Sequence, residues 1–118
     1  AYSMTIGATA GVDPESLVHS RYIIIWACNM ISTNLHLWPF VAEAQKRGAK
    51  VVVIDPMRHR TAKAADWHIP IRPGTDGALA LAMMHVIIAE GLTDEAYVRD
   101  HTVGYDELVE RVRDHTPE

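Results

Sequence analysis

Two short apolar runs rich in β-branched residues constrain the fold of this chain most strongly. Residues 22–26 are Tyr-Ile-Ile-Ile-Trp, and residues 51–54 are Val-Val-Val-Ile. Continuous runs of this kind are typical of strands that are buried on both faces of a parallel sheet. Between them, residues 37–47 have the pattern of a helix with a proline in its first turn and Gly48 at its end. The sequence therefore predicts a βαβ unit with a right-handed crossover.

Further elements extend this unit at both ends. Asp13 followed by Pro14 predicts the start of a short helix that ends near Ser20. A second short helix is expected around residues 61–65. Residues 67–71 predict a third strand, and Pro70 confines it to an edge or to a strand end, because proline donates no backbone hydrogen bond.

The longest predicted helix covers residues 77–90 and is apolar almost all round. That pattern is typical of a helix covered on most sides, and we expect a neighbouring domain to cover part of it. Two shorter helices are expected from residues 93 and 106 onward. Together the elements predict an α/β fold class: a Rossmann-like three-layer domain with a short parallel sheet flanked by helices, formed as a single domain by residues 1–118.

The composition excludes several classes of protein. Eleven basic and fifteen acidic side chains give a net charge of −4, which does not fit nucleic-acid binding. No apolar stretch reaches the roughly 18 residues of a membrane span. Cys28 is the chain's one cysteine, so an internal disulfide or an all-cysteine metal site is excluded. The seven histidines show no metal-ligand spacing, and we predict neither a catalytic nor a metal-binding residue.

Three polar loops follow the predicted strands, at residues 27–34, 55–61 and 72–76. In open parallel sheets, ligands bind beyond the carboxyl ends of the strands. The loops supply amide, hydroxyl, cationic and carboxylate groups, which suit a nucleotide. The first loop has no glycine, so the dinucleotide fingerprint and the Walker A loop are both missing and a plain NAD or ATP site is disfavoured. The predicted cofactor-binding residues are Ala27, Cys28, Asn29, Thr33, Asp55, Pro56, Arg58, Arg60, Pro73, Gly74 and Asp76.

Four segments in register resemble one enzyme family. They are Ile-Ile-Trp-Ala-Cys-Asn at residues 24–29, Val-Val-Ile-Asp-Pro at 52–56, Thr-Ala and Ala-Asp within 61–66, and Ile-Arg-Pro-Gly-Thr-Asp-Gly-Ala-Leu at 71–79. In this order and spacing the chain is similar to molybdopterin oxidoreductases of the dimethyl-sulfoxide-reductase type, which include formate dehydrogenases and nitrate reductases. The resemblance runs from about residue 12 to the end of the chain.

The resemblance implies a fragment of a larger molybdenum enzyme that carries a molybdopterin guanine dinucleotide cofactor. A Rossmann-like third domain of the family holds the guanosine end of that cofactor. By position, Asn29 would contact phosphate or ribose, Asp55 the ribose, and Asp76 the guanine. The metal ligand and the 4Fe-4S cluster of the parent enzyme would lie outside this chain.

The resemblance also implies partners: the other domains of the same enzyme and electron-transfer subunits. The parent would be of bacterial or archaeal type, and the sequence does not distinguish a cytoplasmic from a periplasmic location. Two positions depart from the family pattern. Ala27 stands where glycine is usual, and Met57 stands where arginine is usual, although Arg58 and Arg60 are near enough to substitute.

Structural explanations stay open beside these functional ones. Asp55 could cap a turn, and Asp76 could cap the long helix. Asp66 is expected to anchor a turn, and His85 to be a hydrogen-bonded core residue. Cys28 is not expected to ligate molybdenum. Two other functions also stay open: an autonomous, non-catalytic nucleotide-binding or regulatory domain, and an interaction module whose apolar helix docks a partner.

Overall fold

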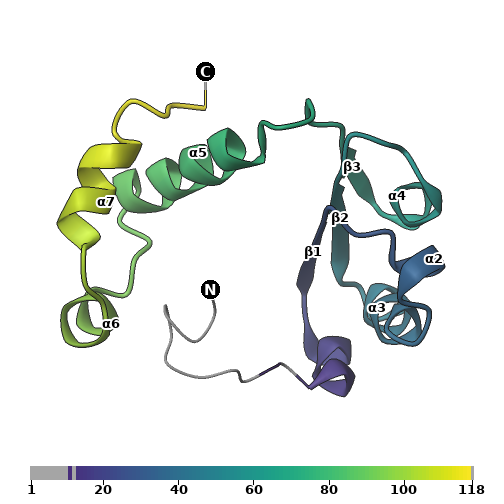
Figure 1. Cartoon of the computed structure of the whole chain (residues 1–118). Helices are drawn as coiled ribbons and strands as arrows, with labels where there is room; N and C mark the ends of the chain where they lie inside the picture. The colour runs from purple at the N-terminus through teal and green to yellow at the C-terminus, as the bar shows by residue number, and fades with distance from the viewer. Residues whose placement is uncertain (1–10, 12, 118) are drawn as a thin grey trace. The chain divides into compact units, whose positions relative to one another are not determined.

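The structure is a computed structural model that describes residue 11 and residues 13–117. It divides into two compact units, the first ending at Ile71 and the second beginning at Arg72, and each is described by itself. Figure 1 shows their elements along the chain. In order these are η1 (Pro14–His19), β1 (Tyr22–Trp26), α2 (Met30–Thr33), α3 (Trp38–Lys46), β2 (Lys50–Ile54), α4 (Arg60–Ala64), β3 (Trp67–Ile69), α5 (Asp76–Ala89), α6 (Glu95–His101) and α7 (Tyr105–Val112).

The three strands of the first unit form one parallel sheet in the order β1-β2-β3. The expected bounds of β1 are confirmed, β2 begins one residue earlier than expected, and β3 ends at Ile69, just before Pro70. The short helix after Asp13 is confirmed as a 3-10 helix, with the Asp13 carboxylate accepting from Glu15 N at 3.0 Å. The predicted α/β fold class is confirmed. The prediction of a single domain stays a prediction.

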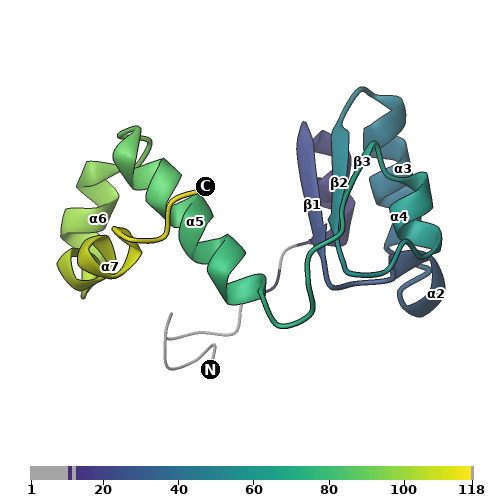
Figure 2. The same cartoon turned by 90° about the horizontal axis from the view of Figure 1, so that it is seen from above.

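The core of the first unit lies on one face of the sheet. Ile23 and Ile25 of β1 are in register with Val51 and Val53 of β2, so all four side chains point to the same face. Helices cover this face (Figure 2), and the buried cluster includes side chains from α2, α3 and α4. Burying one such aliphatic side chain stabilises a fold by roughly 1.5–3 kcal/mol. The buried cluster is formed by Ile23, Ile25, Met30, Val41, Ala44, Ala49, Val51, Val53 and Ala62.

The opposite face of β1 is more exposed than the sequence predicted. Tyr22 is 54% exposed and Ile24 is 43% exposed, although we expected β1 to be buried on both faces. That expectation is wrong for β1 because it lies at the edge of the three-stranded sheet and has one strand neighbour. It is correct for β2, whose central position leaves Val51 to Ile54 all buried.

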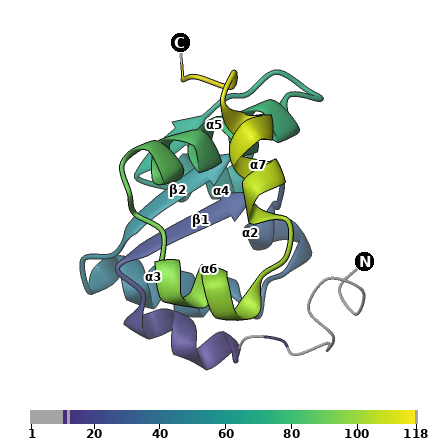
Figure 3. The same cartoon turned by 90° about the vertical axis from the view of Figure 1, so that its left-hand side faces the viewer.

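The second unit consists of α5, α6 and α7, and its core is much smaller. Helices α5 and α7 pack against each other (Figure 3), and His85 of α5 donates from Nδ1 to the Val112 carbonyl oxygen at 2.9 Å. The expected hydrogen bond of His85 is confirmed, but the expected core position is wrong, because His85 is only half-buried. None of the 14 residues of α5 is buried, so our expectation that a neighbouring domain covers part of this helix stays a prediction. Among the helices described here, none is long and apolar enough to cross a membrane.

Candidate functional site

The carboxyl ends of β1 and β2 lie at the same edge of the sheet. Trp26 and Ile54 are register partners, and Ala27 N donates to the Ile54 carbonyl oxygen at 2.9 Å. Ala27 has φ of 51°, the one positive φ of a non-glycine residue in the described part of the chain. This left-handed conformation costs an alanine about 1–2 kcal/mol, and glycine adopts it freely. The loop therefore makes a backbone bend that suits glycine, at a cost in strain.

Asn29 follows this bend and is held by a helix from elsewhere in the chain. Its side-chain Oδ1 accepts from Thr61 Oγ1 of α4 at 2.9 Å. Thr61 Oγ1 in turn accepts from Ile31 N at 3.1 Å, so one buried hydroxyl ties the β1 loop to α4. The side chain of Asn29 makes no capping hydrogen bond to α2.

Asp55 is the first residue after β2, and both of its carboxylate oxygens have neighbours. Oδ1 accepts from Met57 N at 2.8 Å, which closes the turn at Pro56. Oδ2 lies 3.3 Å from His59 Nε2 in a close contact whose geometry falls short of a well-aligned hydrogen bond. The turn-capping explanation of Asp55 is confirmed, and the same contacts hold its carboxylate in one orientation.

His59 and Thr61 lie at the start of α4 and hold the two predicted ligand residues of the first unit. His59 caps α4 by accepting from Ala62 N at Nδ1 (3.3 Å). Neither residue is among the cofactor-binding residues that the sequence predicts, although Thr61 lies in one of the four segments that resemble the family. The available signal for Thr61 was its place beside an apolar alanine, which indicates a buried position. A buried hydroxyl requires hydrogen-bond partners.

Two cations and a hydroxyl complete this edge of the sheet. Arg58 and Arg60 are exposed, and no ion pair joins either of them to another residue of the described ranges. Thr33 donates from Oγ1 to the Asn29 carbonyl oxygen at 3.0 Å, and its side chain is exposed. Pro56 is exposed between Asp55 and Arg58.

The loop that contains Pro73, Gly74 and Asp76 belongs to the second unit. Gly74 has φ of 82°, and Thr75 donates from Oγ1 to the Arg72 carbonyl oxygen at 2.7 Å, which makes a tight turn before α5. Asp76 is the first residue of α5, and the residue before it is the helix N-cap. A carboxylate in the first helical turn also interacts favourably with the helix dipole.

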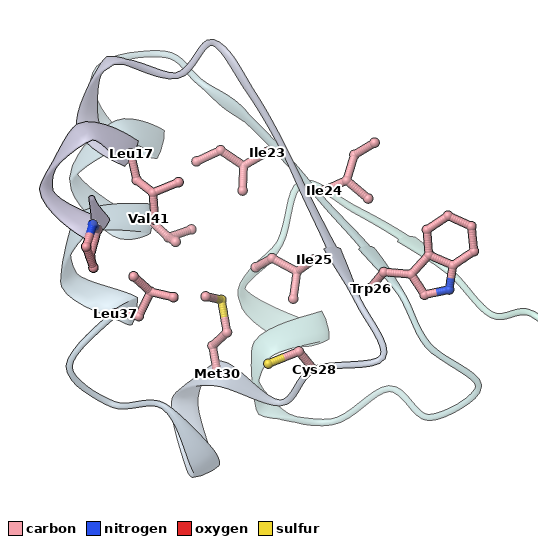
Figure 4. Close-up of a pocket in the computed structure, with 10 residues that line it drawn as sticks. Leu17, Ile23, Ile24, Ile25, Trp26, Cys28, Met30, Leu37 and Val41 are labelled. Atoms are coloured by element: carbon pink, nitrogen blue, oxygen red, sulfur yellow. The ribbon is translucent and has the colours of Figure 1, made fainter. Parts of the chain in front are cut away.

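Cys28 faces an apolar pocket on the core side of β1 (Figure 4). Figure 4 shows Ile23 and Ile25 on one side of the strand and Ile24 and Trp26 on the other. Cys28 is partly buried and packs against the core cluster, and its predicted cofactor contact stays a prediction. None of the described residues that line the pocket is charged, so it does not suit a nucleotide. It is lined by Pro14, Leu17, Ile23, Ile24, Ile25, Trp26, Cys28, Met30, Leu37 and Val41.

Asp66 anchors the beginning of β2, whereas the sequence predicted that it anchors a turn. Its Oδ2 accepts from Val51 N at 2.7 Å and from Gln45 Nε2 at 3.1 Å. The hydrogen bond from the Val51 backbone lowers the pKa of the Asp66 carboxyl below its ordinary value, and the hydrogen bond from Gln45 and the charge of Lys50 act in the same direction. In the described part of the chain, no group of three or more histidine, cysteine, aspartate or glutamate side chains is arranged to hold a metal ion.

Comparison with known proteins adds independent information. The family model for molybdopterin oxidoreductases matches residues 2–105. The chain is 50% identical over 99% of its length to the probable oxidoreductase YoaE of Bacillus subtilis (strain 168), of which it covers 17%. It is 37% identical over 92% of its length to the assimilatory nitrate reductase catalytic subunit of the same organism, of which it covers 16%.

A solved structure has the same fold. The acetylene hydratase from Pelobacter acetylenicus matches 87% of this chain and 16% of its own length, with a TM-score of 0.73 and 34% sequence identity. The chain thus spans about a sixth of the length of the relatives that it matches.

Proposed function

The chain belongs to the molybdopterin oxidoreductase family, and on this premise we propose that it holds the guanosine end of a molybdopterin guanine dinucleotide. The parent enzyme is then a molybdenum-dependent oxidoreductase, with its metal ligand and its 4Fe-4S cluster outside these 118 residues. The bound cofactor supplies the redox chemistry, and this segment contributes binding and orientation. The relatives have names with different activities, so the similarity assigns no substrate.

One observation carries the proposal: the two polar side chains that follow β1 and β2 are each held in one orientation at the same edge of the sheet. Asn29 is fixed by Thr61, and Asp55 is fixed by Met57 N and His59. An amide can donate to phosphate or ribose oxygens, and a carboxylate can accept from ribose hydroxyls. This donor set fits the sugar and phosphate part of a nucleotide.

Charge and backbone geometry support the same assignment. Arg58 and Arg60 are exposed and have no internal ion pair among the described residues, so both guanidinium groups can neutralise a pyrophosphate. They stand beside Met57, where related sequences usually have arginine. Ala27, with its left-handed bend, is exposed at the same edge of the sheet.

We assign the guanine to Asp76. The Watson–Crick edge of guanine presents N–H donors, which a carboxylate accepts, whereas adenine presents an acceptor at the corresponding ring nitrogen and would be repelled. A charged hydrogen-bonded contact of this kind contributes roughly 1.5–3 kcal/mol, or about a ten- to hundredfold change in affinity.

The test is binding of GDP and ADP to the 118-residue chain, measured by calorimetry. The wild-type chain should bind GDP more tightly than ADP, and Asp76→Ala should weaken GDP binding about ten- to hundredfold and remove the preference. Asp106→Ala is the matched control, because Asp106 stands in the first turn of α7 as Asp76 does in α5. Equal binding of both nucleotides by the wild-type chain would refute the proposed function.

A further inference from the structure

Thr61 is a fully buried hydroxyl with two long-range hydrogen bonds. It is 0% exposed, and it is the one polar residue among the buried residues of the described chain. Its partners are the backbone N–H of Ile31 at 3.1 Å and the side chain of Asn29 at 2.9 Å, 30 and 32 residues away. A buried hydroxyl that only stabilised α4 would bond within its own helix turn, as threonines in helices commonly do. This one bonds to the β1 loop instead.

The chemistry of the contact determines which way the Asn29 amide points. The Ile31 N–H can only donate, so the Thr61 oxygen is an acceptor there. The single proton of the hydroxyl is then donated to Asn29, and the atom that receives it must be the amide oxygen Oδ1. The amide nitrogen of Asn29 therefore stands on the side away from Thr61, and no residue of the described part of the chain accepts from its two N–H donors.

We propose that Thr61 is a positioning residue of the nucleotide site. It holds Asn29 in the rotamer and amide orientation that direct two N–H donors to a phosphate or ribose oxygen. This inference rests on the proposed function. Without Thr61, Asn29 would have to be ordered by the ligand, and ordering one side chain on binding weakens affinity about two- to tenfold.

Two complementary variants test this role. Thr61→Val keeps the shape of the side chain and removes the hydroxyl, whereas Thr61→Ser keeps the hydroxyl and removes the methyl group. With GDP as the probe and calorimetry on the 118-residue chain, Thr61→Val should bind about two- to tenfold more weakly than wild type, and Thr61→Ser should bind as wild type does.

A double-mutant cycle separates positioning from general destabilisation. If Thr61 acts through Asn29, Thr61→Val should have no further effect on GDP binding in an Asn29→Ala background. An equal loss in both backgrounds would overturn the inference. The inference would also be overturned if Thr61→Val bound GDP as tightly as wild type while Asn29→Ala bound GDP more weakly. By contrast, if Asn29→Ala bound GDP normally, the contact proposed for Asn29 itself would be wrong.

A second variant keeps the test decisive if Thr61→Val does not fold. Asn29→Asp retains an oxygen that can accept from Thr61 and removes the two N–H donors. The expected result is a thermal melting temperature close to that of wild type together with at least a tenfold loss of GDP affinity, since a carboxylate would face a phosphate. Unchanged GDP affinity would show that the amide N–H donors do not contact the nucleotide, and a melting temperature lowered as far as that of Asn29→Ala would show that the amide nitrogen faces Thr61. Either result would overturn the assignment.

Discussion

The first unit, which ends at Ile71, and the second unit, which begins at Arg72, differ in how their apolar residues are used. Of the described residues that are buried, only Val112 lies in the second unit. Yet α5 is the most continuously apolar helix of the chain, and none of its residues is buried. In the first unit, short apolar strands suffice for a core, because pairing places Ile23, Ile25 and their β2 partners on one surface that helices cover.

The difference shows that hydrophobic composition alone does not bury a side chain. A central strand such as β2 gains a neighbour on each side and a helix layer on its face, whereas a helix with one helical partner keeps much of its surface in contact with water. The candidate site follows the same division. Asn29 and Asp55 stand on the well-packed unit, and Asp76 opens the less buried helix.

The largest expected effect is on the free energy of unfolding, and it compares one isoleucine in each unit. Ile25 is 4% exposed in β1, and Ile87 is 41% exposed in α5. Ile25→Ala should lower the free energy of unfolding by about 2–5 kcal/mol, because it leaves a cavity in the core. Ile87→Ala should change it by no more than about 0.5 kcal/mol. Urea denaturation of the 118-residue chain measures both, and equal losses would abolish the distinction between the units.

A smaller effect concerns the left-handed residues of the two units. Ala27 has φ of 51° in the first unit, and Gly104 has φ of 82° in the second. Ala27→Gly should raise the free energy of unfolding by about 0.5–1 kcal/mol, because relief of strain exceeds the added chain entropy. Gly104→Ala should lower it by about 1 kcal/mol. Thermal melting of both variants checks this, and a destabilised Ala27→Gly would show that the bend at Ala27 is unstrained.

The smallest effect should appear as a pH dependence confined to the first unit. The pKa of Asp66 is lowered from its ordinary 3.8, chiefly by the Val51 backbone hydrogen bond. Its contribution to stability is therefore complete above that ordinary value and disappears as the pH falls through the lowered value. Because Asp66 is exposed, solvent keeps the contribution small.

Asp66→Asn provides the comparison. Wild type should be the more stable protein at neutral pH, and the difference should shrink in acid below about pH 4. Amide exchange in β2, where Val51 N donates to Asp66, gives the local readout. A difference that is constant from neutral pH into acid would show that the charge of Asp66 contributes nothing.

Local features of the chain predicted most of the elements. The bounds of β1 followed from its apolar run, and η1 followed from Asp13 and Pro14, because capping and strand burial are local or period-two effects. Burial could not be predicted in the same way. The exposure of Tyr22 and Ile24 depends on β1 being an edge strand, and strand order is decided by the whole sheet.

The predicted ligand residues show the same difference between local features and features that depend on the whole fold. The sequence by itself determined which polar residues follow each strand, and with them Asn29, Asp55 and the turn at Asp55, because loop position and turn chemistry are encoded within a few residues. Only the tertiary structure decided how Asn29 is held, since its partner Thr61 lies 32 residues away on another helix. A buried hydroxyl selects its partners by proximity in space, and that proximity exists only once the sheet has brought the β1 loop and α4 together.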